Sequence, residues 1–154
     1  MKPKKLKLKN FGPFINETVD FSRLTEAPLF LISGKTGAGK TTIFDGITFA
    51  LFGETSGRLR SGKEMRSLFA TPDEETSVTF SFEHQQMSYE IERKPEQVLA
   101  KRKGNGTKKQ AAKVTLTIFD GKGKEIKQIT KRTEADQLIR ELMNLDAKQF
   151  SQIV

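Results

Sequence analysis

Eight consecutive residues of this chain have types and spacing that suit one kind of chemistry. Residues 34–41 read Gly-Lys-Thr-Gly-Ala-Gly-Lys-Thr, which is a complete G-x-x-x-x-G-K-T pattern. Glycines without side chains let the backbone bend around an anion and aim its N–H groups inward. Lys40 supplies a movable positive charge for outer phosphates, and the Thr41 hydroxyl can bind a magnesium ion. The pattern predicts a loop that binds a nucleotide.

The segments on either side of this loop strengthen the prediction. Residues 29–32 form an apolar run suited to a buried strand, and residues 41–52 are long and apolar enough for a buried helix. Such a helix directs the positive end of its dipole at the anion. A glycine-rich turn beside a surface lysine is the alternative, but it requires neither flanking element. The predicted site is Gly34, Lys35, Thr36, Gly37, Ala38, Gly39, Lys40, Thr41 and Thr42, with Thr41 on Mg.

Composition limits the class of protein. The 154 residues fit one domain of ordinary size. The net charge of +8 favours acidic partners such as nucleic acid, and the absence of cysteine excludes disulfides and thiolate metal sites. No apolar run approaches the length that spans a membrane, and the basic start lacks the apolar stretch of a signal peptide. We expect a cytoplasmic protein without membrane contact.

Alternating apolar and polar residues predict several antiparallel strands. They are expected at residues 5–10 and 18–21, as a hairpin through 78–82 and 89–91, and at 114–118 returning to 126–129. A last helix is predicted at 133–144 with Thr133 as its cap, and a short helix near 64–69. Together with the loop and its helix, these elements predict an α/β fold.

Residues 94–113 are strongly basic, with seven Lys or Arg against one Glu, and predict a mobile loop. One interpretation is a solvated loop. The other is a contact with the phosphates of duplex DNA, because clustered cations displace condensed counterions. The segment has no aromatic residue, which argues against stacking on single strands. The candidate DNA contacts are Lys101, Arg102, Lys103, Lys108 and Lys109.

Residues for nucleotide hydrolysis are missing from the pattern. Asp120 follows an apolar run and fits an Asp-x-x-Gly motif, but residues 120–123 describe a hairpin turn just as well, which is the preferred interpretation. The guanine-reading Asn-Lys-x-Asp and a Ser-Gly-Gly signature stretch are both absent, and His84 is expected to be exposed rather than catalytic. We predict no catalytic residue in this chain, which looks like half of an active site.

The start of the chain and the loop region resemble the SMC-like, ABC-type ATPases of chromosome maintenance and repair. The resemblance rests on residues 7–14 (KLKNFGPF), on 29–34 leading into the loop, and on 44–55 (FDGITFALFGET). Within that group the chain is most similar to the SbcC branch. Residues 145–150 and 153–154 look like the segment that leads into the Q-loop of the family. The resemblance covers essentially the whole chain.

The resemblance implies a particular architecture and function. Residues 1–154 would be the N-terminal lobe of an ABC-type ATPase head, with antiparallel strands beside the P-loop strand and helix, while coiled coil and C-terminal lobe lie outside. ATP and Mg would be the ligands, and Asn10, Phe11 and Gly12 would border the ribose. The partners would be the C-terminal lobe, a second copy in an ATP-dependent head dimer, a nuclease subunit and double-stranded DNA. The whole protein would control a nuclease in DNA repair and recombination, and this chain alone should not hydrolyse ATP.

Three other interpretations stay open. The chain could belong to another SMC-like ATPase of DNA repair, of the RecF or RecN type. A free-standing small P-loop kinase or GTPase would need a catalytic carboxylate and a base-reading motif within these residues. A nucleic-acid-binding module with a vestigial loop would be driven by the positive charge, and nucleotide affinity with and without magnesium distinguishes it from the first interpretation.

Overall fold

The computed structural model describes residues 1–24, 33–37, 39–55 and 61–153, with side chains up to residue 150. The predicted strand at 29–32 lies outside these residues. The elements in chain order are β1 (Lys2–Phe11), β2 (Phe14–Asp20), η1 (Ser22–Leu24), α1 (Lys40–Phe52), β3 (Ser77–His84), β4 (Met87–Lys94), β5 (Gln97–Ala100), β6 (Thr107–Gln110), β7 (Lys113–Phe119), β8 (Glu125–Ile129), α2 (Arg132–Met143) and α3 (Ala147–Ile153). None of the described helices is long and apolar enough to cross a membrane.

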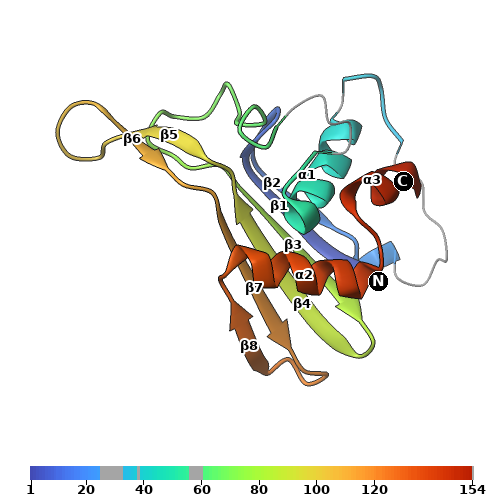
Figure 1. Cartoon of the computed structure of the whole chain (residues 1–154). Helices are drawn as coiled ribbons and strands as arrows, with labels where there is room; N and C mark the ends of the chain where they lie inside the picture. Colours follow the sequence, from blue (N-terminus) through green and yellow to red (C-terminus); the bar gives the residue numbers. More distant parts are fainter. Residues whose placement is uncertain (25–32, 38, 56–60, 154) are drawn as a thin grey trace.

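A six-stranded antiparallel sheet forms one layer, in the order β2-β1-β3-β4-β7-β8. The three α-helices lie together on one face of it, with α1 against the middle strands and α2 against β7 (Figure 1). In β3 and β4 the apolar residues alternate with polar ones, and the apolar set is buried under the helices. The predicted α/β class is therefore confirmed.

The core lies between α1, α2 and the sheet. Side chains from neighbouring strands and from one side of each helix are buried there, including Leu6, Leu8, Phe80, Ile91, Leu116, Phe49, Leu51 and Ile139. The turn between β3 and β4 consists of Gln85 and Gln86, both with positive φ (49° and 66°), which is the backbone shape that a two-residue hairpin needs. The predicted hairpin at this point is confirmed.

The basic segment was predicted to be a mobile loop, and that prediction is wrong. β5 and β6 pair as a two-stranded antiparallel hairpin that projects beyond the main sheet (Figure 1). Its base is fixed because Gln97 is buried and its amide donates to the side-chain oxygen of Gln110 at 3.1 Å. Gly104 and Gly106, both with positive φ, form the turn at its tip.

The predicted helix near 64–69 is also wrong, whereas the helix predicted at 133–144 is confirmed as α2 and only its predicted cap is wrong. Residues 64–69 form turns, because the carbonyl of Met65 accepts from the Gly12 N–H (2.6 Å) and the Ser67 N–H donates to the Asn10 carbonyl (2.8 Å). These backbone groups pair with the end of β1 and not with one another. The last predicted helix begins at Arg132, so its N-cap is Lys131 and Thr133 lies inside the first turn.

Candidate nucleotide-binding site

The glycine-rich loop leads directly into α1. Residues 33–37 are exposed, and Gly39 is the N-cap of the helix that starts at Lys40. Gly39 has φ 92°, and a Cβ atom added to it would lie 2.6 Å from Cζ of Phe14. This position thus requires glycine both for its left-handed backbone and for its contact with β2. Ala38 lies outside the described residues.

The ammonium group of Lys40 folds back over the loop. Its Nζ donates to the carbonyl oxygen of Gly34 and, at 3.3 Å, to that of Lys35. The side chain therefore spans the loop from its last residues to its first. A positive charge held in this place can move onto phosphate oxygens without a change in the backbone, because Lys is a compact charge on a long stem.

The start of α1 is suited to an anion. Within the described part of the chain, no side chain caps this helix, so its first N–H groups and the positive end of its dipole face the loop. Thr41 is exposed in the first turn and Thr42 is partly buried beside it. The described residues contain no group of three or more His, Cys, Asp or Glu that could hold a metal ion.

Asn10, Phe11 and Gly12 are consecutive in the chain but lie in different environments. Asn10 and Phe11 are fully buried, and Phe11 packs against Phe49 with ring centroids 5.8 Å apart. Gly12 contacts the first turn of α1, since a Cβ atom there would lie 2.7 Å from Cγ2 of Thr42. Gly12 is therefore the member of this trio closest to the loop, and the two buried residues hold it in place.

Behind this turn lies a buried polar network that the sequence did not indicate. Asn10 has φ 50°; its carbonyl accepts from the Thr76 hydroxyl (2.9 Å) and its Nδ2 donates to the Glu75 carbonyl (3.0 Å). Gln97 pairs with the backbone of Thr76 on both sides: its Oε1 accepts from the Thr76 N–H (2.7 Å) and its Nε2 donates to the Thr76 carbonyl (3.2 Å). The network joins the turn beside α1 to the base of the basic hairpin.

A cation, Arg66, holds the segment between α1 and β3 to this network. Its guanidinium donates to the carbonyls of Glu74 (2.6 Å) and Thr71 (3.0 Å) and to the Thr76 hydroxyl (3.2 Å). Arg66 also pairs with Phe11 as an isolated antiparallel bridge. The hydrogen-bond partners lie five to ten residues away along the chain, and Phe11 lies on β1, so no local pattern identifies this set of partners.

The candidate DNA contacts lie on the β5–β6 hairpin and not in the glycine-rich loop. Lys101, Arg102, Lys103, Lys108 and Lys109 are all exposed on the β5–β6 hairpin. Lys109 forms an ion pair with Glu96 at 3.2 Å, and its hydrogen bond and charge hold the pKa of that carboxyl below its usual range. The hairpin presents these cations to solvent on a folded support.

The structure also places the residues weighed as catalytic candidates. The Asp120 carboxylate accepts from the backbone N–H groups of Lys122 and Lys124, both at 2.9 Å. It therefore closes the β7–β8 turn, and the turn interpretation is confirmed. His84 was expected to be exposed, but it is half-buried at the end of β3.

The loop, the lysine that spans it and the uncapped helix define a P-loop nucleotide-binding domain. The family model described as "AAA domain" matches residues 5–154, and the chain belongs to this family. The chain is 48% identical over 157 residues to the SbcC subunit of the nuclease SbcCD from Lactococcus lactis subsp. lactis. It is 44% identical to proteins of the same name from Vibrio cholerae (155 residues) and Staphylococcus aureus (153 residues). The predicted resemblance to the SbcC branch is confirmed.

These relatives are much longer than the chain. The matches cover 99% or 100% of this chain but 15% of each relative. A solved structure titled "Structural biochemistry of ATP-driven dimerization and DNA stimulated activation of SMC ATPases" superposes on the chain with a TM-score of 0.47 at 16% identity, covering 99% of this chain and 91% of that one.

Proposed function

We propose that this chain is the ATP-binding half of an SbcC-type ATPase head that controls a partner nuclease acting on DNA ends and hairpins. The observation that carries the proposal is the Lys40 ammonium held across the glycine loop by the Gly34 and Lys35 carbonyls. The family match over residues 5–154 and the relatives named as part of a nuclease support it. In this proposal the chain is the N-terminal lobe, and residues 1–154 form one unit.

The residues of the loop bind and orient the nucleotide. Backbone N–H groups of the loop and of the first turn of α1 would hold the phosphates, and the Lys40 ammonium group would supply positive charge to the outer phosphates. Bound ATP with magnesium supplies a triphosphate whose terminal group can be hydrolysed when the rest of the head is present. Thr41 would provide the hydroxyl for the metal, and Gly12, which packs on Thr42, would border the sugar.

In this proposal the chain contributes half of the ATP site, and its partners supply the other half. The C-terminal lobe of the same protein and a second copy of the head would complete the ATP site, and an SbcD-type subunit would be the nuclease. The basic hairpin would contact double-stranded DNA through its exposed Lys and Arg side chains. Hydrolysis requires residues beyond this chain, so the chain alone should bind ATP without turning it over.

Isothermal titration calorimetry with ATP, in the presence and absence of magnesium, tests the proposal. Lys40→Ala should weaken binding at least about tenfold, because it removes a charged hydrogen bond to phosphate. Thr41→Ala should lose mainly the part of the affinity that depends on magnesium. Lys124→Ala, which removes an exposed lysine from the β7–β8 turn, is the matched control and should bind normally. Equal affinity for Lys40→Ala and the control would refute the assignment of the loop.

A further inference from the structure

A hollow of about 450 Å³ lies beside the turn that joins β1 to β2. Gly12 and Pro13 of this turn form one side of it, and residues from the segment 64–69, between α1 and β3, form the other. We call it the turn hollow, and its lining includes Gly12, Pro13, Met65, Arg66, Leu68 and Phe69. Its size suits a small ligand or one part of a larger one.

The turn hollow lies next to the start of α1, where the nucleotide loop ends. A Cβ atom on Gly12 would lie 2.7 Å from Cγ2 of Thr42 in the first turn of that helix and 3.7 Å from Cε of Met65, which lines the hollow. Gly12 therefore lies between the helix start and the hollow. A nucleotide with its phosphates at the helix start and its sugar beside Gly12 would place its base at the turn hollow.

The turn hollow carries the most exposed apolar side chains of the described residues. Leu68 is 98% exposed and Phe69 is 74% exposed, which are the highest values among the large apolar residues there. Pro13 and Met65 add to the apolar lining. Within the part of the chain that the structure describes, the Phe69 ring packs against no other aromatic ring. Such a ring can stack on a nucleobase, because every base has a π-face.

The backbone that carries these two side chains is held in place. The Gly12 N–H donates to the Met65 carbonyl (2.6 Å), and the Ser67 N–H donates to the Asn10 carbonyl (2.8 Å). The Phe69 N–H donates in turn to the Ser67 hydroxyl (3.2 Å). The exposed side chains therefore lie on a fixed support, so that little conformational entropy would be lost when a ligand binds to them.

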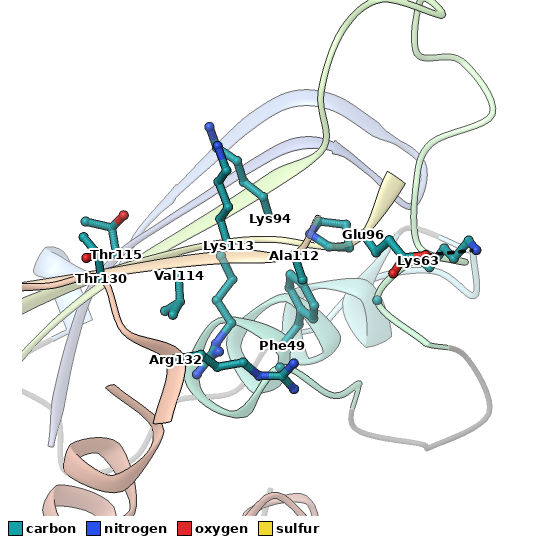
Figure 2. Close-up of a pocket in the computed structure, with 14 residues that line it drawn as sticks. Phe49, Lys63, Lys94, Glu96, Ala112, Lys113, Val114, Thr115, Thr130 and Arg132 are labelled. Carbon is teal, nitrogen blue, oxygen red and sulfur yellow. Dashed lines mark ion pairs between the residues drawn. The ribbon is translucent and has the colours of Figure 1, made fainter. Parts of the chain in front are cut away.

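A second hollow, of about 500 Å³, lies at the C-terminal end of α1 and does not suit the base. The helix from Lys40 to Phe52 has 13 residues, so at 1.5 Å per residue this end lies about 18 Å from the helix start. The cations of this hollow also face different ways, since the Lys113 side chain lies on the opposite face of the sheet from Val114 and Arg132 (Figure 2). Distance thus favours the turn hollow as the place for the base.

We propose that the turn hollow binds the base of the bound nucleotide, with the Phe69 ring stacked on the base. The polar side chains at the hollow already have partners within the chain. Arg66 donates to two carbonyls and a hydroxyl, and the Glu64 carboxylate accepts from the Ser61 N–H at 2.6 Å. Stacking and apolar contact therefore supply the interaction. The inference rests on the proposed function and adds the residues that hold the base to the loop that holds the phosphates.

Calorimetry on the full-length protein with two ligands tests the inference. One ligand is a non-hydrolysable ATP analogue, which carries the base, and the other is inorganic tripolyphosphate, which lacks it. Phe69→Ala should weaken binding of the analogue at least about fivefold, because the base loses its aromatic partner. The same variant should bind tripolyphosphate as the wild type does. Phe69→Tyr keeps a ring and should bind both ligands normally.

Ile126→Ala is the matched control. Ile126 is also a large apolar residue at the surface (55% exposed), but it lies on β8, at the sheet edge opposite β2. This variant should bind both ligands normally.

Phe69→Trp gives a direct signal, because residues 1–154 contain no tryptophan. A base stacked on the indole ring should quench its fluorescence. The ATP analogue should therefore lower the emission, after subtraction of the wild-type signal, and tripolyphosphate should not.

Three results would overturn the inference. The first is equal affinity of Phe69→Ala and the wild type for the analogue. The second is an equal loss of affinity for both ligands, which would place the effect in the loop. The third is a loss that changes with protein concentration, which would assign Phe69 to a contact between protein molecules. Normal binding of both ligands by Phe69→Ala refutes the base site alone, whereas a wild type that binds neither ligand refutes the proposed function.

Discussion

Arg93 is the buried cation whose removal should have the largest effect on folding. Its side chain is 5% exposed, and its Nε and Nη2 donate to the carbonyls of Ala50 (2.7 Å) and Leu51 (2.9 Å), while Nη2 also bonds Asp136. The two carbonyls belong to the last turn of α1, where helical partners are missing. Burial lowers the pKa of Arg93, and the Asp136 carboxylate opposes that shift. One side chain thus joins β4, α1 and α2.

Arg93→Met keeps most of the apolar stem but removes all three interactions. Breaking a buried charge pair by deleting one partner costs about 3–5 kcal/mol, and two helix carbonyls lose their donors in the same step. Because domains of this size are stable by about 5–15 kcal/mol, this loss would remove roughly a fifth of the stability at the least, and all of it at the most. Urea denaturation followed by circular dichroism measures the loss. The stability of Arg93→Lys should lie between those of the wild type and Arg93→Met. An ammonium group cannot bond both carbonyls and the carboxylate in the same geometry.

Arg132→Met is the matched control, because it removes the exposed partner of the same carboxylate. An exposed i,i+4 pair contributes about 0.5 kcal/mol or less, so this variant should unfold at nearly the wild-type urea concentration. If Arg93→Met lost no more stability than Arg132→Met, the role assigned to Arg93 would be refuted.

Three further predictions concern the loop, the acid limit of stability and the hairpin. Gly39→Ala should weaken ATP binding about tenfold in calorimetry, because the left-handed backbone of Gly39 and its contact with Phe14 both exclude a Cβ atom. Gly104→Ala is the control and should bind ATP normally, because Gly104 also has a positive φ (79°) but has open space around it. Burial raises the pKa of Glu75, but hydrogen bonds from Gln110 and Lys94 and the charges of Lys94 and Lys9 outweigh it, so the pKa lies below its usual range. This carboxylate therefore stabilises the fold at neutral pH and loses that effect as the pH falls through its lowered pKa; Glu75→Gln should flatten the acid part of a stability-against-pH curve, and an unchanged curve would contradict the assignment. Replacing Lys101, Arg102, Lys103, Lys108 and Lys109 with Gln in the full-length protein should reduce the slope of log DNA affinity against log salt by about 0.9 for each phosphate that is no longer bound, with ATP binding intact; identical slopes would show that the hairpin does not contact DNA.

Local patterns were sufficient for the parts of the fold that depend on neighbours in the chain. Alternation predicted β3, β4 and β7 because one face of each strand is buried, and the turn at Asp120 followed from its side chain bonding nearby N–H groups. The phosphate loop was predicted because its function requires fixed residue types at fixed spacing. The extent of α1 was predicted to within one residue.

The elements that were missed depend on partners far away in the chain. In the sequence, Gln97 is an ordinary polar residue in a basic segment. Its partner Thr76 lies 21 positions earlier, and only the fold brings the two together. Arg93 likewise has no feature in the sequence that distinguishes it from the other cations. Its partner at the end of α1 is brought to it only by the fold. One missed element did have a local signal: Asp146 and Gln149 cap α3 reciprocally at 2.8 and 3.0 Å, which is the spacing of a capping box.

The buried pairing of Gln97 with Thr76 sets which parts of the molecule can open independently. Separating the hairpin from the sheet would expose both backbone groups of Thr76, and the hydroxyl of the same residue donates to the Asn10 carbonyl. Amide hydrogens at the base of the hairpin and at the turn beside α1 should therefore exchange with solvent as one cooperative unit. The tip of the hairpin, beyond this pairing, is free to exchange faster. A ligand that slows exchange at one end of the unit should then slow it at the other, without any shift in the average structure.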